Sequence, residues 1–342
     1  MSARPAPFRL AGKQHGFVLV LTLWVLAMVA VAAGYFGERV ARATQLAQQS
    51  RQNTRAIIDM AGTRAELLYR LGTTTMTEYG LGRGNTVIAL DNRPYHGLGD
   101  TLAQLQDDRG LLNLNLADDG RLQRFLGLMG IPSEQRPRMI DTLHDYTDAD
   151  NLTRLNGAEE ADYLALNLPP PTNSNLVTPW EARRILGWRD VPQLWENGRL
   201  AELTTTSLSV GINPNTAPAE VLATLPGVTE EMAQAIIARR KLSPITSEGQ
   251  IVGTAAAPLS QLFGMGVVAI PSDAIRITQS TRALPWAIQY NITLTPGGKD
   301  APWQTDYYSR ISKNHMHDAE VLDLPPRSSA PADKPPAFLL GG

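Results

Sequence analysis

A long hydrophobic stretch near the N-terminus runs directly into a stretch with helical periodicity. From Phe17 to Val31 only Thr22 is polar, and the apolar run to Ala33 is close to the lower length limit of a transmembrane helix. Between Glu38 and Leu71 there is no proline. Small or apolar residues recur there every three or four positions, at Ala43, Ala47, Ser50, Thr54, Ile58, Ala61, Ala65 and Leu68. This spacing forms one helix face, so we predict one helix from Phe17 to about Leu71, transmembrane over 17–37 and amphipathic beyond.

The pattern of the remaining chain predicts a mixed region of strands and helices. Short strand patterns occur at 86–90 and 103–106, and they return near the end at 274–281, 286–295 and 307–311. Helical patterns lie between them, at 121–128, 137–146, 180–186, 217–225 and 230–240. A start with strands, a helical centre and an end with strands indicate one β-domain interrupted by a helical insertion. The predicted fold class is therefore α+β, preceded by the long helix.

Composition narrows the chemistry that the chain can perform. The 342 residues include no cysteine, which excludes disulfides, thiolate metal ligands and cysteine nucleophiles. Lys+Arg 31 against Asp+Glu 33 gives a net charge of -2, which argues against a general binder of polyanions. The five histidines and the serines form no recognisable catalytic pattern, so we predict no enzyme activity and assign no catalytic residue. From Leu324 onward the chain is proline-rich, and we predict a disordered tail.

The segment before the hydrophobic run is basic. Arg4, Arg9 and Lys13 precede the run and no acid does, so we expect this leader to remain in the cytoplasm. Two general interpretations are open. Ala30-Val31-Ala32 fits the small-residue pattern of a secretory cleavage site, and the run also suits an ordinary single-span anchor. The predicted helix continues far beyond the run, and a domain released behind a signal peptide does not need this continuity.

Four sequence elements carry a resemblance to a known family. Gly16-Phe17 at the head of the run resembles the processing site of type IV prepilins and pseudopilins. Asp108-Arg109-Gly110 before Leu112-Asn113-Leu114-Asn115, the acidic block 145–159, and Ile212-Asn213-Pro214-Asn215-Thr216-Ala217 complete the set. Together these elements span residues 16–311, and the chain resembles the minor pseudopilin K family of the type II secretion system, also called general secretion pathway protein K.

The resemblance implies a domain organisation. It predicts a basic prepilin-type leader, a transmembrane helix, and a pilin-like αβ head interrupted by a large inserted all-α domain of SAM-like or helix-hairpin-helix-like type. The head would consist of a helix continuation with the first strands and of returning strands, followed by the proline-rich tail. In chain order the predicted bounds are 1–16, 17–37, 38–110, 111–272, 273–312 and 313–342.

The resemblance also implies a function. It predicts a minor pseudopilin at the tip of a pseudopilus, taking part in protein export across the outer membrane. The implied partners are minor pseudopilins I and J, other pseudopilins, the prepilin peptidase that cuts between Gly16 and Phe17, and the inner-membrane assembly platform. The new N-terminus at Phe17 would be methylated. The protein would cross the bacterial inner membrane once, with its head in the periplasm.

The helix carries a further family feature in Leu21, the fifth residue after the expected cleavage point. Most pilins have glutamate there, and an unpaired carboxylate in an apolar filament core is costly. The K pseudopilins share the absence of this acid, which fits a subunit with no neighbour above it. Leu21 can also be read simply as one more residue of a hydrophobic anchor. We predict that the helix packs on partner subunits through a face formed by Leu21, Ile58, Ala61, Ala65 and Leu68.

The acidic block suggests a cation site. Calcium binds six to eight oxygen ligands, which carboxylates and amides on a loop can supply. The block is not an EF-hand, because Leu152 and Thr153 replace the polar fifth residue and the turn glycine. Spacing alone favours a solvated acidic loop, whereas the resemblance implies calcium as a cofactor. The implied ligands are Asp145, Asp148, Asp150 and Glu159, with Asn173 or Asn175 as additional candidates.

The segment around 213–240 supplies an alternative function. Two predicted helices separated by Leu225-Pro226-Gly227-Val228-Thr229 resemble half of a helix-hairpin-helix, whose turn can present backbone amides to DNA phosphates. The alternative is therefore a membrane-anchored periplasmic DNA receptor. Against it, Thr229 replaces a turn glycine, and the basic residues at 239–241 lie at the far end of the second helix. Plain helix packing is the favoured interpretation, and nucleic acid is not an expected partner.

Overall fold

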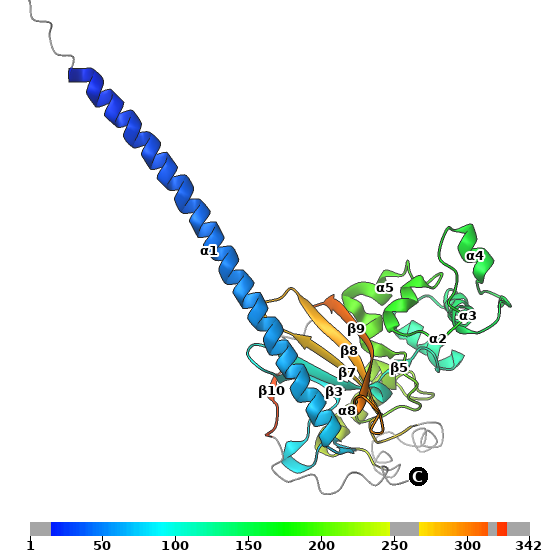
Figure 1. Cartoon of the computed structure of the whole chain (residues 1–342). Helices are drawn as coiled ribbons and strands as arrows, with labels where there is room; N and C mark the ends of the chain where they lie inside the picture. Colours follow the sequence, from blue (N-terminus) through cyan, green and yellow to red (C-terminus); the bar gives the residue numbers. More distant parts are fainter. Residues whose placement is uncertain (1–14, 247–266, 314–319, 327–342) are drawn as a thin grey trace, which may run out of the picture. The chain divides into compact units, whose positions relative to one another are not determined.

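One helix, α1 (His15–Thr73), opens the part of the chain that the structure describes (Figure 1). The computed structural model describes residues 15–246, 267–313 and 320–326. The predicted continuous helix is confirmed and extends slightly further at both ends. The leader before His15 and the tail from Arg327 onward lie outside the described residues, so the prediction of a disordered tail stays untested there. Within the predicted tail 313–342 the prediction is wrong at 322–323, because these residues form a strand that pairs with the sheet. The chain divides into two compact units, residues 1–55 and 56–342.

The first unit contains the hydrophobic part of α1. The large apolar side chains between Phe17 and Phe36 are exposed along it. This helix is long and apolar enough to cross a membrane, judged by its length and composition. A solvent-exposed apolar run of this length is stable only when another apolar phase covers it.

The second unit is built on a six-stranded sheet with the strand order β10-β3-β4-β7-β8-β9. The strands are β3 (Asp91–His96), β4 (Leu102–Asp107), β7 (Ala274–Ser280), β8 (Trp286–Leu294), β9 (Trp303–Ser312) and β10 (Leu322–Asp323). All neighbours are antiparallel except β10 and β3. The strand predicted at 103–106 and the three near the C-terminus are confirmed, and β9 begins four residues earlier than expected.

Three details of the sheet region differ from the prediction. The strand expected at 86–90 is wrong: the 3-10 turn η1 (Gly84–Thr86) occupies its start, and only Ile88 forms a bridge, to Leu81. The chain turns here because Gly80, Gly82 and Gly84 take positive φ angles; Gly80 lies within the short antiparallel pair β1 (Met76–Thr77) and β2 (Gly80–Leu81), and the other two follow it. β3 was missed because it is polar and contains Pro94, and β10 because it is two residues long.

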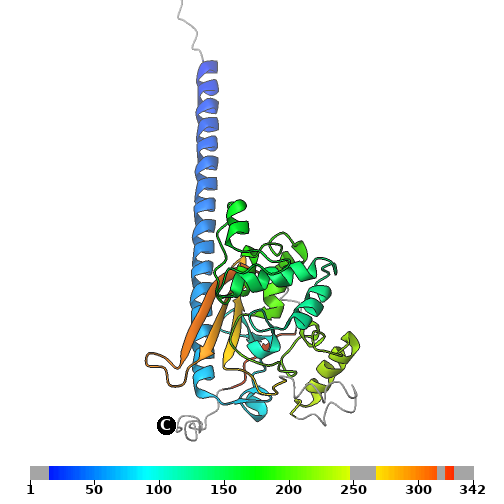
Figure 2. The ribbon, with the colours of Figure 1, turned by 90° about the vertical axis from the view of Figure 1, so that its right-hand side faces the viewer.

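The two faces of the sheet differ in chemistry. Alternate residues of β4, β7 and β8 form an apolar face with the last turns of α1. This core includes Leu67 and Leu71 from α1, and Leu105, Ile277 and Tyr290 from the sheet. The opposite face is polar and lies toward a group of helices, so the sheet stands between the last turns of α1 and these helices (Figure 1, Figure 2).

The helices form an insertion between β4 and β7. It comprises η2 (Asp108–Gly110), β5 (Leu112–Asn113), α2 (Asp119–Leu128), α3 (Arg136–Thr147), α4 (Glu160–Ala165), η3 (Pro179–Arg184), α5 (Pro192–Trp195), η4 (Glu196–Gly198), α6 (Arg199–Leu203), β6 (Thr204–Thr205), α7 (Ala219–Leu222) and α8 (Glu230–Leu242). The insertion has a hydrophobic core of its own, around Phe125, Leu143 and Trp188. The predicted helix at 180–186 is a 3-10 helix, and that at 217–225 shrinks to α7 because Pro218 precedes it and Pro226 follows.

Two buried carboxylates join the insertion to the sheet at the end of β4. Asp107 Oδ1 accepts hydrogen bonds from Ser272 N and Oγ, both at 2.8 Å, where the chain returns to the sheet. Its Oδ2 accepts from Asn213 Nδ2 at 2.9 Å and from Thr216 Oγ1 at 2.8 Å. The Asp107 side chain therefore links the end of β4, where the chain leaves the sheet, to the interior of the insertion and to the segment that returns to the sheet.

The neighbouring Asp108 performs a second linkage. Its Oδ2 accepts from Thr205 Oγ1 at 2.8 Å and from Asn291 Nδ2 at 2.7 Å, which connects β6 of the insertion to β8 of the sheet. Gly110 completes the turn, since a Cβ there would collide with Gln106 Nε2 and Thr216 Oγ1. Hydrogen bonding thus explains Asp108, and close packing explains Gly110, in the Asp-Arg-Gly sequence at the junction.

The junction generates a prediction about stability and pH. Burial raises the pKa of Asp108 to about 6, against the opposing hydrogen bonds from Asn291 and Thr205 and the charge of Arg276. Because this folded-state pKa exceeds the ordinary value of about 4, the stabilisation is complete below about pH 4 and is lost as pH rises through about 6. Asp108→Asn should remove this loss, so the melting temperature of the variant should rise relative to wild type between pH 4 and pH 7. Thermal melts with exposed Asp100→Asn as control test this, and parallel pH profiles for wild type and Asp108→Asn would contradict it.

Candidate metal site in the helical insertion

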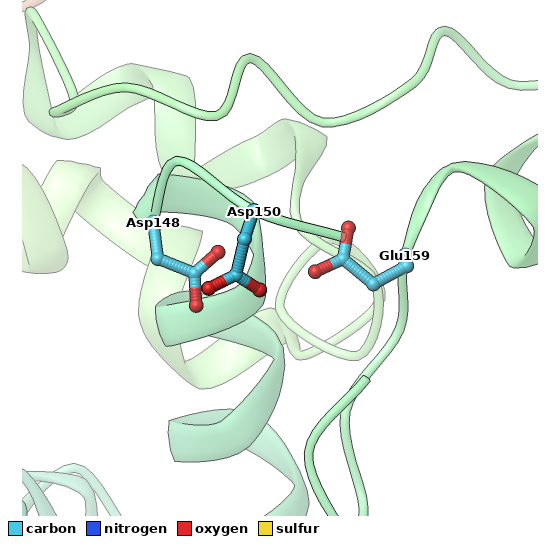
Figure 3. Close-up of side chains that lie close together, drawn as sticks. All are labelled: Asp148, Asp150 and Glu159. Atoms are coloured by element: carbon cyan, nitrogen blue, oxygen red, sulfur yellow. The ribbon is translucent and has the colours of Figure 1, made fainter. Parts of the chain in front are cut away.

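Three carboxylates converge on the loop between α3 and α4. Asp148 follows the last residue of α3, Asp150 lies two residues further, and Glu159 directly precedes α4. One oxygen from each of the three lies within 4.8 Å of the others. Figure 3 shows the three carboxylates turned toward one another. The loop between the helices therefore gathers acids that are eleven residues apart in the sequence.

Several oxygens at this place are buried without a hydrogen-bond partner. Among the described residues, both carboxylate oxygens of Glu159, Oδ1 of Asp148 and Oδ1 of Asn173 have none. Glu159 is 4% exposed, so water reaches its side chain poorly. Buried acceptors without partners are costly, and a cation would satisfy them together.

The negative charges of the cluster also favour a bound cation. Burial raises the pKa of Glu159 to about 7, and the negative charges of Asp145, Asp148 and Asp150 add to the rise. Without a cation, the folded chain keeps like charges together in a poorly solvated place. A divalent ion would reverse this effect, because its own charge dominates the local field.

Asp145 has a different role from the one expected, because it holds the loop. Its side chain is fully buried on α3, and its oxygens accept the backbone N–H of Arg154 at 3.1 and 3.3 Å. The Arg154 side chain lies 3.8 Å away as an ion pair. A Cβ at Gly157 would collide with Asp145 Oδ2, so the chain passes very close. The expectation that Asp145 is grouped with the other three acids is corrected: it positions the loop that presents them.

The two asparagines also differ from each other. Asn173 Nδ2 donates to the Asp150 carbonyl at 3.1 Å and to Asn151 Oδ1 at 2.9 Å, which ties its loop to the acidic one. Its backbone is left-handed, with φ 46°, a conformation that asparagine tolerates. Asn175 is exposed. Of the two, Asn173 is the one that the structure links to the acidic loop.

Sequence reasoning missed one supporting residue. Asp141 Oδ2 accepts the backbone N–H and the side-chain amide of Asn156 at 3.0 and 2.9 Å. Asp141 lies four residues before Asp145 on α3, hence on the same face, and this spacing was the available signal. The two acids hold both sides of the loop 154–157. All candidate ligands carry oxygen, a set that suits hard cations such as calcium or magnesium.

The segment that suggested DNA binding is engaged in internal packing. Arg240 donates to the carbonyls of Pro214 and Ala217 at 2.9 and 2.6 Å, and Arg239 donates to Ser243 Oγ at 2.9 Å. Thr229 caps α8 by accepting the N–H of Met232 at 3.3 Å. Arg239 and Arg240, two of the three basic residues at 239–241, therefore form hydrogen bonds within this segment itself.

Most of the predicted assembly face of α1 is exposed. Phe17, at the expected processing site, and Leu21 have exposed side chains in the first unit. In the second unit Ile58, Ala61 and Ala65 are exposed, but Leu68 is 9% exposed and belongs to the core beneath the sheet. Leu68 is therefore corrected from a partner contact to a core residue, because the helix rotates it toward the sheet.

Comparisons with known proteins agree on one family. A family model described as "Type II secretion system (T2SS), protein K" matches residues 101–194, and a second model with the same description matches residues 212–269. A chain in the crystal structure of the GspK-GspI-GspJ complex from the enterotoxigenic Escherichia coli type 2 secretion system matches with a TM-score of 0.55 and 14% identity. This match covers 80% of the present chain and 100% of that chain, and at this identity it shows the fold. No curated protein matches the chain, and none of the comparisons supports a DNA receptor.

Proposed function

We propose that this chain belongs to the protein K family of the type II secretion system, that it is the minor pseudopilin at the tip of the pseudopilus, and that it takes part in protein export across the outer membrane. The observation that carries the proposal is the match of two separate segments, 101–194 and 212–269, to models of protein K. These segments include most of the insertion and the strand from which it leaves the sheet. Its family is a structural component of a secretion system, and we assign no catalytic role.

Assembly would use α1 in two ways. The exposed apolar stretch from Phe17 to Phe36 would lie in the inner membrane before assembly and against neighbouring helices afterwards. The head would remain in the periplasm throughout. Leu21 places no charge in the apolar seam, which suits a subunit that has no neighbour above it.

The partners of this assembly would be the minor pseudopilins I and J. The similar solved structure is a GspK-GspI-GspJ complex, which motivates the same grouping here. Ala61 and Ala65 offer small side chains on an exposed helix face, and small residues let two helices approach closely. The peptidase that processes Gly16-Phe17 and the inner-membrane platform would act before this step.

The acidic cluster would bind calcium. Asp148, Asp150 and Glu159 would supply carboxylate ligands, with Asn173 Oδ1 as a fourth protein oxygen. Calcium accepts an irregular shell of oxygens, whereas magnesium requires a tighter octahedron and dehydrates reluctantly. The ion would tie α3, the loop after it and α4 together, so its role would be structural.

Processing of the N-terminus is the first test. A prepilin-type peptidase should remove residues 1–16 and leave an N-methylated Phe17, which mass spectrometry of the membrane-extracted protein detects. Gly16→Leu should block cleavage and leave insertion intact, because the apolar run is unchanged. Gly12→Leu within the leader is the matched control. A mature N-terminus at Ala33 would instead identify a secretory signal and contradict the pseudopilin function.

Partner binding is the second test. Ala61→Arg and Ala65→Arg should each weaken co-purification with pseudopilins I and J by about tenfold or more, because a charge enters an apolar helix seam. Both residues are exposed, so the melting temperature of the isolated chain should stay within a few degrees of wild type. Leu68→Arg should unfold the head instead, because Leu68 is in the core. If Ala61→Arg and Ala65→Arg both bind the partners as strongly as a Ser133→Arg control does, this face is ruled out.

Calcium binding is the third test. Calcium should raise the melting temperature of the chain by an amount that grows with its concentration, and magnesium should do so weakly. Asp148→Asn and Glu159→Gln should abolish this rise, whereas Glu160→Gln, at the exposed neighbouring position, should keep it. Asp145→Asn should lower the melting temperature with or without calcium, because it loosens the loop. Identical melting curves in calcium and in a chelator would reduce the cluster to a solvated acidic loop.

A further inference from the structure

A cleft of about 780 Å³ lies between the polar face of the sheet and the insertion. Its floor comes from β3, β4, β7, β8 and β9, and its other wall from η3, α5, η4 and α6. Both walls belong to the second unit. Because the floor crosses five neighbouring strands, the cleft runs across the strand direction.

The floor contains a registered row of polar side chains. Gln104 of β4 lies opposite Thr278 of β7, and Thr278 lies opposite Gln289 of β8. All three line the cleft. Neighbouring strands are about 4.8 Å apart, so the row presents hydrogen-bonding groups at that interval.

These groups are only partly used within the chain. Gln104 Nε2 donates to the Asn92 carbonyl at 2.8 Å, and Gln289 Nε2 donates to Thr278 Oγ1 at 3.3 Å. Gln289 is 5% exposed, and its Oε1 has no partner among the described residues. A buried amide oxygen without a donor is unfavourable, and a donor group that enters the cleft and reaches this oxygen would remove the cost.

The opposite wall carries aromatic rings held by an arginine. The Arg183 guanidinium lies 4.6 Å from the centre of the Trp195 ring and 5.8 Å from that of Trp180. Trp195 Nε1 donates to the Trp188 carbonyl at 2.8 Å, which fixes its indole. This wall therefore combines rigid rings with a planar cation.

The charges of the cleft largely balance. Arg199 is paired with Glu220, and Arg276 donates to backbone carbonyls of 201–204. The cleft is also lined by two further basic residues, Arg183 and Lys313, and by two acidic residues, Glu196 and Glu202. A strong single-sign field would select a charged ligand, and this cleft has none.

We propose that this cleft binds a neutral, linear, β-linked glycan that lies across the strands. Sugar hydroxyls both donate and accept hydrogen bonds, as amide side chains such as Gln104 and Gln289 require. The ring faces of pyranoses pack on indoles, and a β-linked pyranose advances along its chain by close to the spacing of the floor row. An extended peptide repeats its side chains on one face at about 6.8 Å, which does not match the row.

The test uses the full chain in lipid nanodiscs, because detergents with sugar headgroups would compete. Saturation-transfer NMR and calorimetry measure binding of the hexasaccharides of β-1,4-linked N-acetylglucosamine and of β-1,4-linked glucose. The double variant Gln104→Met with Gln289→Met keeps side-chain size and removes the hydrogen-bonding groups. It should weaken binding by about tenfold or more, whereas Gln304→Met, the same change on exposed β9, should leave binding unchanged.

Three results would overturn the proposal. These are no binding of either glycan at millimolar concentration, equal binding by wild type and the double variant, and binding of an extended peptide in place of the glycans. The melting temperature of the double variant is measured in parallel, so a loss of binding counts only in a folded chain. Thr278→Val, which removes one hydroxyl and keeps the branched side chain, is a second test of the same row and should also weaken binding.

Discussion

The pair of buried carboxylates at the end of β4 is the interaction on which the head depends. Among the described residues the head has two large hydrophobic cores, one between α1 and the sheet and one inside the insertion, and a small third cluster around Ala56, Met60 and Leu284. Asp107 and Asp108 lie where the chain passes from the sheet into the insertion. They accept hydrogen bonds from Asn213 inside the insertion, from Ser272 where the chain returns to the sheet, and from Asn291 of β8. Charge-assisted hydrogen bonds of this kind are directional, so they set the orientation of the insertion on the sheet, which apolar burial alone would leave loose.

That orientation explains the unusual polarity of the second sheet face. A face buried under a second layer is normally apolar, but here Gln104, Arg276 and Gln289 alternate with the core residues. The insertion is held by its junction and contacts this face only in part, which leaves a cleft between them. The cleft therefore opens onto the polar face, while the apolar face stays covered by the last turns of α1.

The acidic loop also contains side chains with two different roles. Asp141 and Asp145 each satisfy backbone N–H groups of the loop, while Asp148, Asp150 and Glu159 face one another. Asp150 also accepts the backbone N–H of Leu152 at 2.8 Å, whereas both oxygens of Glu159 and Oδ1 of Asp148 have no partner among the described residues. Buried acceptors without partners are costly, and a cation would offset that cost. The acidic segment thus contains both acids that hold the backbone and a candidate metal site.

Local pattern in the sequence determined α1, α2, α3, α8 and the long strands, because apolar periodicity and the absence of proline act over short distances. It also indicated the family, the acidic segment and the importance of the Asp-Arg-Gly turn. Tertiary structure decided the rest: that Asp145 supports the loop, that Leu68 faces the core, and that polar β3 and short β10 join the sheet. These depend on which face a side chain presents to residues far away in sequence. No local pattern contains that information, because it arises only when the separate cores are joined.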